Sequence, residues 1–140
     1  ISVKADFERE LPPINGDANQ LEQAFLNIVI NAWHAMPEGG RLTVAARAVP
    51  AAERHRRIGR PALPGVEVVI ADTGTGIAPE HMSKIFDPFF STKGVGKGTG
   101  LGLAISRRII EDHHGGIDVD SAVGHGTTFS IWLPAEKGKT

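Results

Sequence analysis

The glycine-rich stretch at residues 94–103, GVGKGTGLGL, has a spacing that lets backbone come close to phosphate. Glycine occupies every second position from Gly94 to Gly102, and an apolar-periodic stretch typical of a helix follows. A helix that begins near Gly100 presents free N–H groups and the positive end of its dipole to an anion. Lys93 and Lys97 add positive charge. The stretch predicts either a phosphate-binding loop or a mobile linker before a glycine-capped helix.

The two common phosphate-loop motifs do not fit this stretch. A dinucleotide fingerprint needs glycine at positions one, three and six directly after a strand. Counted from each possible first glycine, the sixth position is Thr99, Leu101 or Leu103, and the preceding residues do not read as a strand. A Walker loop needs Ser or Thr after its Gly-Lys pair, but Lys97 is followed by Gly98. The sequence therefore excludes both motifs.

A second candidate is Asp72 in the segment DTGTGI, residues 72–77. The aspartate ends a stretch rich in β-branched residues, and Gly74 and Gly76 allow another group to approach the backbone. A buried aspartate at such a turn can accept a hydrogen bond from an exocyclic amine, the group that marks adenine. The alternative is an Asx-type turn without a ligand, which is the commoner reason for Asp-x-Gly.

A third candidate is the pair Asn27 and Asn31, four residues apart in the otherwise apolar string QAFLNIVINAWHAM. This spacing places both amides on one face of a helix. Paired amides on a core-facing stripe are costly unless they are satisfied, and oxygen ligands suit Mg²⁺. Either amide alone also fits a buried structural role. The segment GHGT at 124–127 adds a further region that could contact a ligand, although a plain hairpin turn is the commoner explanation for it.

The composition narrows the class of protein. The chain has 140 residues, a net charge of −1 and no cysteine, which fits one soluble domain without disulfides or thiolate metal sites. Interspersed charges predict no general binding of nucleic acid or of an anionic membrane. Every apolar run is far shorter than the roughly 20 residues that a membrane helix needs. The chain opens inside an expected strand, so we expect a piece of a longer protein. We expect this piece to be cytoplasmic, and the parent protein to be either soluble or anchored in a membrane.

Hydrophobic periodicity predicts an α+β fold. Alternation indicates strands, the first of them half-buried, and apolar residues at three- and four-residue steps indicate helices, the first capped by Asp17. Strands and helices are mixed without strict alternation, which predicts a two-layer sandwich with a mixed sheet covered by helices on one face. The expected strands are 1–7, 41–49, 66–72, 117–122 and 127–133, the expected helices are 17–36, 80–85 and 101–113, and 50–64 is an expected loop.

Taken in order, these segments resemble the sequence boxes of the ATP-binding catalytic domain of two-component sensor histidine kinases, within the gyrase, Hsp90, histidine kinase and MutL superfamily. The resemblance covers residues 17–133, and the strings AMPEGG and FFSTK are most similar to the nitrogen-regulatory branch. It implies a single ATP-binding domain with the fold of that superfamily. The matching boxes are the N box at 17–36, the G1 box at 72–77, the F box at 85–93, the G2 box at 98–103 and the last glycine box at 124–127, with an ATP lid at 86–99.

The resemblance also implies roles for individual residues. Asp72 would hold the adenine amine with help from Thr127. Asn31 would coordinate a Mg²⁺ that bridges the phosphates, with Asn27 lining the same site, and Lys93 would contact the γ-phosphate during catalysis. The remaining implied nucleotide contacts are His34, Gly74, Gly76, Ile77, Phe86, Lys97, Gly98, Thr99, Gly100, Leu101, Gly102 and Leu103.

Two positions depart from related patterns. Water-splitting branches of the superfamily carry a glutamate base where this chain has Asn27, and an amide cannot take a proton from water. This difference favours transfer of the phosphoryl group to a protein over hydrolysis. Many members carry a lysine where this chain has His34, which is either a phosphate contact or a polar residue at the helix end.

The resemblance implies that the phosphate acceptor is a histidine on a separate helical dimerisation domain, through which a response regulator is then reached. We therefore expect this chain to be monomeric and unable to phosphorylate itself, and the parent protein to be a homodimer. Alternatives within the fold are an ATP-hydrolysing enzyme and an anti-sigma-type serine kinase. A distant alternative is a retroviral-type aspartic protease, suggested by the Asp-Thr-Gly at 72–74, but such proteases are all-β.

Overall fold

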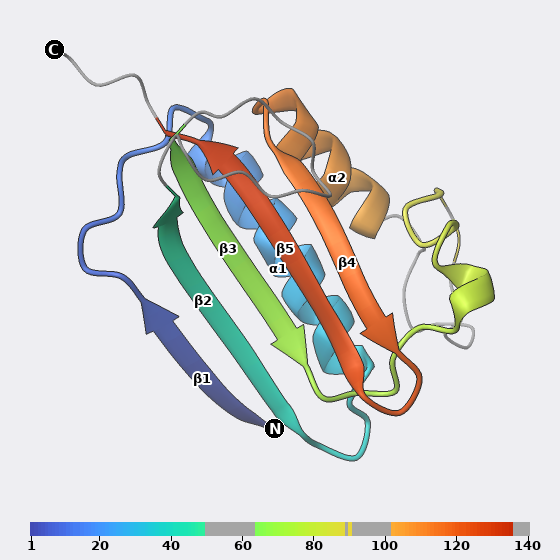
Figure 1. Cartoon of the computed structure of the whole chain (residues 1–140). Helices are drawn as coiled ribbons and strands as arrows, with labels where there is room; N and C mark the ends of the chain where they lie inside the picture. The colour runs from blue at the N-terminus through green and yellow to red at the C-terminus, as the bar shows by residue number, and fades with distance from the viewer. Residues whose placement is uncertain (50–63, 89, 91–101, 136–140) are drawn as a thin grey trace, which may run out of the picture.

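The structure is a computed structural model that describes residues 1–49, 64–88, 90 and 102–135 (Figure 1). Most of the expected loop at 50–64 and of the expected lid at 86–99 lies outside these residues. The strands are β1 Ser2–Phe7, β2 Arg41–Val49, β3 Gly65–Asp72, β4 Gly116–Ala122 and β5 Gly126–Pro134, and the helices are α1 Ala18–His34, α2 Gly102–Asp112 and the 3-10 helix η1 Pro79–His81.

The strands form one mixed sheet in the order β1-β2-β3-β5-β4. Strands β1 and β2 are parallel, because α1 carries the chain from the end of one back to the start of the other, and the remaining neighbours are antiparallel. Both long helices lie on the same face of the sheet (Figure 1). The predicted α+β sandwich is confirmed, and so is the hairpin that joins β4 and β5.

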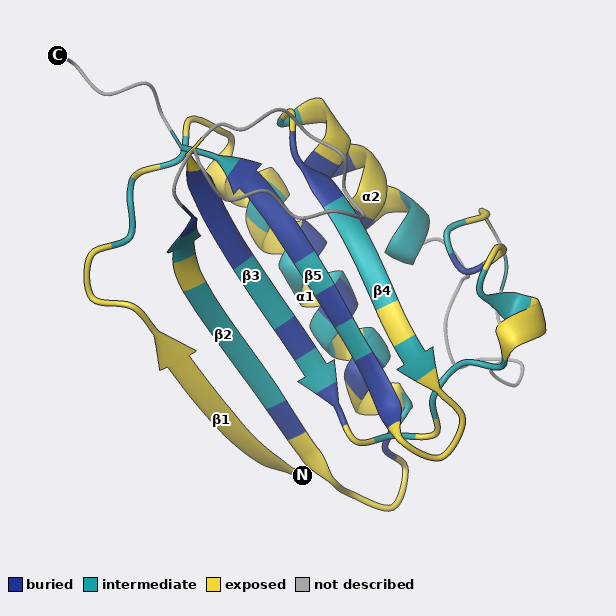
Figure 2. Ribbon diagram, in the orientation of Figure 1, coloured by how far each residue is buried: buried dark blue, intermediate teal, exposed yellow. Residues whose placement is uncertain are grey.

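The core lies between this sheet and the two helices. Helix α1 buries Ala24, Ile28 and Ala32, which recur at four-residue steps and therefore form one stripe. Asp17 caps its first turn as predicted, with the carboxylate accepting from the backbone N–H of Asn19 at 2.9 Å. Burial is concentrated on β3 and β5 at the centre of the sheet (Figure 2). The buried apolar residues of these strands include Val66, Ile70, Phe129, Ile131 and Leu133.

The prediction that the first strand is half-buried is wrong. All six residues of β1 are exposed, and Val3 and Phe7 have exposed fractions of 63% and 56%. The alternation does place Val3 and Phe7 on the face that the helices cover, since they pair with Leu42 and Ala46. However, β1 is the edge strand, and neither α1 nor α2 extends over it in the described part of the chain (Figure 2).

The short helix predicted at 80–85 is also only partly correct. The structure has a single 3-10 turn, η1, that begins at Pro79. The bonds that follow span three residues rather than four, for example from the N–H of Lys84 to the carbonyl of His81 at 2.8 Å. A segment this short cannot offset the cost of nucleating an α-helix, so it stays a chain of tight turns that buries Ile85.

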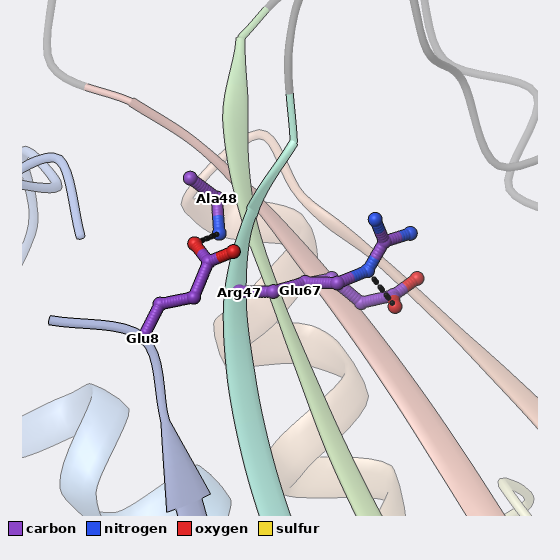
Figure 3. A network of polar contacts seen from close by, with 4 residues as sticks. All are labelled: Glu8, Arg47, Ala48 and Glu67. Carbon is purple, nitrogen blue, oxygen red and sulfur yellow. Dashed lines mark hydrogen bonds and ion pairs between the residues drawn. The ribbon is translucent and has the colours of Figure 1, made fainter. Parts of the chain in front are cut away.

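Two charged contacts stabilise the sheet at the end remote from Asp72 (Figure 3). Beyond the end of β1, the Glu8 carboxylate accepts from the N–H of Ala48 at 2.7 Å. It thereby gives a hydrogen-bond acceptor to a backbone N–H on the edge of β2 that β1 no longer covers. Arg47 donates from Nε to Glu67, its partner across the strands, at 3.0 Å. Glu67 is buried, so this ion pair keeps an acidic group from lying unpaired on the sheet.

Candidate nucleotide-binding site

Asp72 is the last residue of β3 and has an exposed fraction of only 6%. Its Oδ1 accepts from the N–H of Gly74 at 2.9 Å, which closes the turn that follows the strand. Burial raises the pKa of the Asp72 carboxyl above its usual range, and this effect exceeds the opposing one of the N–H groups of Gly74 and Thr127. A carboxylate kept in such surroundings is a candidate for binding a ligand.

The glycine turn after Asp72 rests on the end of α1. The N–H of Thr75 donates to the carbonyl of Ala35, the C-cap of that helix, at 3.0 Å. At Gly74 a Cβ would lie 2.3 Å from the same carbonyl oxygen, so only glycine permits this approach. The predicted turn at 72–77 is thereby held against the helix that carries Asn27 and Asn31.

Ser121, near the end of β4, was missed by the sequence analysis. Its Oγ accepts from the N–H of Ile77 at 2.8 Å, donates to the carbonyl of Gly126 at 3.0 Å and lies 2.8 Å from Oγ1 of Thr127. Since the single Ser121 proton goes to Gly126, the hydroxyl of Thr127 is the donor in the third contact. One serine thus joins two of the predicted segments, 72–77 and 124–127. A serine near a hairpin is too common to signal this role.

The two asparagines lie on α1, half-buried and one turn apart, as predicted. Asn27 donates from Nδ2 to the carbonyl of Gly102 at 3.4 Å, and Gly102 is the first residue of α2. Asn27 therefore lies beside the start of the second helix, the end at which a helix attracts anions, and Asn31 lies one turn further along α1. His34, the last residue of α1, is exposed.

Phe86 and Leu103, which the sequence predicts as nucleotide contacts, also pack against the buried core. The Phe86 ring meets the Phe129 ring edge-on at 6.4 Å between centroids, and the Arg107 guanidinium lies 5.2 Å above it. Leu103, in the first turn of α2, packs against the buried core. These contacts attach the chain to the fold at residues on both sides of the undescribed stretch 91–101.

Several predicted site residues lie outside the described part of the chain. The described residues bring together Asp72, the glycine turn, Thr127, the asparagine pair and the start of α2, whereas the ligand contacts of all of them stay predictions. The predicted residues outside the described ranges are Lys93, Lys97, Gly98, Thr99, Gly100 and Leu101.

Comparison with known proteins identifies the family. The model of the histidine kinase-, DNA gyrase B-, and HSP90-like ATPase family matches residues 16–137. The chain is 48% identical to the sensor kinase CckA of Brucella abortus over 96% of this chain and 14% of CckA. It is 44% identical to the sensory histidine kinase/phosphatase NtrB of Vibrio alginolyticus over 96% of this chain and 37% of NtrB. The crystal structure of full-length ShkA in complex with AMPPNP superimposes with a TM-score of 0.77, at 29% identity, over 99% of this chain and 26% of ShkA.

The chain belongs to the histidine kinase-, DNA gyrase B-, and HSP90-like ATPase family. Its relatives are sensor kinases, and it corresponds to their ATP-binding catalytic domain. NtrB is among them, as the likeness to the nitrogen-regulatory branch implied, although CckA has the higher identity. The family match and the two long helices exclude the aspartic protease. The chain covers 14% of the length of CckA and 37% of the length of NtrB.

Two kinds of feature are absent from the described residues. None of their helices has both the length and the apolar character required to cross a membrane. The same residues hold no group of three or more His, Cys, Asp or Glu side chains placed to bind a metal.

Proposed function

We propose that this domain binds Mg²⁺-ATP between the end of β3 and helix α1 and presents its γ-phosphate to a histidine of a separate domain. The observation that carries the proposal is Asp72, a buried carboxylate at the end of a central strand, in a turn held against α1. The likeness to ShkA, whose structure contains AMPPNP, supports a nucleotide at the corresponding place.

Asp72 is suited to recognise adenine. A carboxylate has about four acceptor positions, and the two backbone donors that stabilise it leave capacity for an amine donor. Because the group is buried, a hydrogen bond to it is stronger than one in water. Guanine carries a carbonyl where adenine carries its amine, so the same carboxylate would repel it. Asp72 would therefore select ATP over GTP.

The asparagine pair fits a magnesium ion that is shared with the phosphates. Mg²⁺ prefers oxygen, keeps several waters and takes few protein ligands when a nucleotide supplies phosphate oxygens. Asn31 and Asn27 offer amide oxygens on the helix face beside the start of α2. We assign Asn31 the direct contact, with Asn27 lining the site. The ion would supply charge neutralisation at the phosphates.

The reaction we propose is transfer and not hydrolysis. A hydrolytic enzyme needs a base for the attacking water, and the Asn27 amide cannot accept that proton. Phosphoryl transfer depends mainly on positioning and on stabilising charge, which backbone N–H groups, a lysine and the metal can provide. Lys93 is our candidate for the γ-phosphate contact. In this proposal the acceptor histidine lies on another domain of the longer parent protein, which forms a homodimer. The response regulator is a separate partner protein that is reached through that domain.

Replacing Asn31 by alanine should weaken Mg²⁺-ATP binding roughly tenfold, the effect of losing one ligand to a charged group. The measurement is calorimetric titration with ATP, once with Mg²⁺ and once with a chelator. In the wild type the chelator should weaken binding, whereas in Asn31→Ala it should make little further difference. Asn19→Ala, an exposed asparagine on the same helix, is the control. An unchanged response to magnesium in Asn31→Ala would contradict the assignment.

Incubation with Mg²⁺ and γ-labelled ATP should leave no acid-labile phosphate on the isolated chain. The described histidines lie at helix ends or in turns of this domain, His113 and His125 among them, and we assign none of them as the acceptor. The full-length parent protein should acquire acid-labile, alkali-stable phosphate under the same conditions. Label on the isolated chain, or rapid ATP hydrolysis by it, would overturn the proposed division between the two domains.

A further inference from the structure

His113 fastens the far end of α2 to the beginning of α1. Its Nε2 accepts from the backbone N–H of Asp17 at 3.0 Å, and its Nδ1 lies 2.7 Å from the carbonyl oxygen of Ile109. A carbonyl only accepts and a backbone N–H only donates, so the ring is neutral with its proton on Nδ1. Both ring nitrogens are therefore used by this contact.

The residues around His113 are adapted to this contact. A Cβ at Gly16 would lie 2.4 Å from Cδ2 of the imidazole, so only glycine lets the ring reach the N–H of the next residue. Asp17 is at the same time the N-cap of α1. His114, two residues after the end of α2, has a φ of 65°. We call the contact between His113 and the Asp17 N–H the clasp.

Two further bonds join the helices along the same seam. The buried Ser106 hydroxyl donates to the carbonyl of Ala24 at 2.8 Å, and Asn27 donates to Gly102 at 3.4 Å. The helices are antiparallel, so the clasp marks one end of the seam and the Asn27 contact the other. At 1.5 Å per residue, Ser106 lies about 10 Å from His113 and about 6 Å from Gly102 along α2.

The clasp limits how α2 can turn on α1. Burial of Ile109 and Ile110 packs α2 on the core, and the bond at Ser106 fixes one point of the seam. The clasp adds a directional bond just beyond the C-terminal end of the helix and so restricts the remaining tilt of α2 on α1. Because a helix is stiff over this length, restricting its tilt also restricts where its first residue, Gly102, lies against Asn27.

We propose that His113 is a positioning residue for the nucleotide phosphates, which sets the start of α2 against Asn27 and Asn31 through the clasp. The inference rests on the proposed binding of Mg²⁺-ATP between these elements. The adenine end of the site is built from β3, β4 and β5 and does not depend on the clasp. Loss of the clasp should therefore weaken recognition of the triphosphate and leave recognition of adenine unchanged.

Three substitutions separate the clasp from the other contact of the ring. Glutamine can place an acceptor near the position of Nε2 and so retains the bond to Asp17. Asparagine reaches only the position of Nδ1 and retains the bond to Ile109, whereas alanine retains neither. The affinities for Mg²⁺-ATP and for adenosine are measured by calorimetry on the full 140-residue chain. The readout is the ratio of the two affinities.

We expect His113→Ala and His113→Asn to lose roughly threefold to tenfold in ATP affinity with adenosine affinity unchanged, and His113→Gln to stay near the wild type. Ile131→Val, a core substitution on β5 that removes no hydrogen bond, controls for lost stability alone and should keep the ratio. An unchanged ratio in His113→Ala, or an equal fall for both ligands, would overturn the inference. A wild type that binds adenosine but not ATP would instead contradict the proposed function.

The wild-type protein offers a measurement that needs no variant. Two-dimensional ¹H-¹⁵N spectra of the imidazole distinguish which ring nitrogen carries the proton. We expect His113 in the form protonated at Nδ1, because Nε2 accepts from Asp17. A ring protonated at Nε2 excludes the clasp, and with it the inference, even if the His113 variants fail to fold.

Discussion

Asp72→Asn should lose ATP binding by roughly 10- to 100-fold while the domain remains folded. The asparagine keeps one amide oxygen, whose two lone pairs can accept from the N–H groups of both Gly74 and Thr127, so the turn can close as before. In place of the other carboxylate oxygen it presents an NH₂ group, which faces the adenine amine as a second donor. The loss therefore concerns recognition of the ligand, not the fold.

The same substitution should not lower stability near neutral pH. Burial raises the pKa of the Asp72 carboxyl, so its charged form is less favourable in the folded protein than in the unfolded chain. A group with a raised pKa contributes its full stabilisation of the fold below the pKa that it has in the unfolded chain, about 3.9. This stabilisation is lost as the pH rises through the pKa that the group has in the folded protein. Asparagine resembles the protonated carboxyl and does not suffer this loss. The advantage of the variant should thus emerge above about pH 4 and persist at pH 7.

Calorimetric titration measures the affinity, and urea unfolding at several pH values measures the stability. In thermal unfolding, ATP at 100 times its dissociation constant should stabilise the wild type by about 2.7 kcal/mol, and the variant much less. Asp72→Ala is the contrasting change, because it leaves the N–H groups of Gly74 and Thr127 without their acceptor and should lower stability. Wild-type ATP affinity in Asp72→Asn would rule out the adenine assignment.

Gly126→Ala should destabilise the domain by at least about 3 kcal/mol, the largest loss of stability we expect from a single methyl group. Gly126 begins β5 with a φ of 95°, and an added Cβ would lie 2.0 Å from the carbonyl oxygen of Asp72. The obstacle is backbone at the end of a central strand, which cannot move aside as a flexible side chain can. Relief of the clash would separate β5 from β3 at the point where Thr127 pairs with Asp72.

Gly124→Ala is the matched control for this prediction. Gly124 lies in the same hairpin turn with a φ of 82°, but nothing lies within 4 Å of the added Cβ. Gly124→Ala should lower the free energy of unfolding only by the strain of an alanine in left-handed backbone conformation, about 1 to 2 kcal/mol. Urea unfolding of both variants gives the comparison. Equal losses would show that strain in φ, and not the approach of Gly126 to Asp72, explains why glycine stands at 126.

The elements that the sequence predicted correctly are those that local rules define. Asp17 caps α1 because its short side chain reaches N–H groups two and three residues ahead. The paired runs around residues 124–127 form a hairpin because their alternation and turn residues lie next to one another in the chain. The order of the boxes then indicated the family, since several short motifs in one order are far more specific than any one of them.

The errors and omissions concern contacts between distant parts of the chain. The alternation in β1 resembles that of a half-buried strand, but whether helices cover it depends on its place at the edge of the sheet. The turn at 79–81, in contrast, did not grow into an α-helix for a local reason, since the segment is too short to offset the cost of nucleation. Of these two outcomes, only the exposure of β1 lacks a signal in the local pattern.

By itself the sequence determined the elements, the family and the residue types of the site, because these follow from periodicity, capping and short motifs. Only the tertiary structure decided which of these residues meet. Thr75 is held by Ala35, Ile77 by Ser121, and Asp17 by His113, which is 96 positions away. Such contacts arise because packing the helices on the sheet brings together groups whose separation along the chain carries no information about their separation in space.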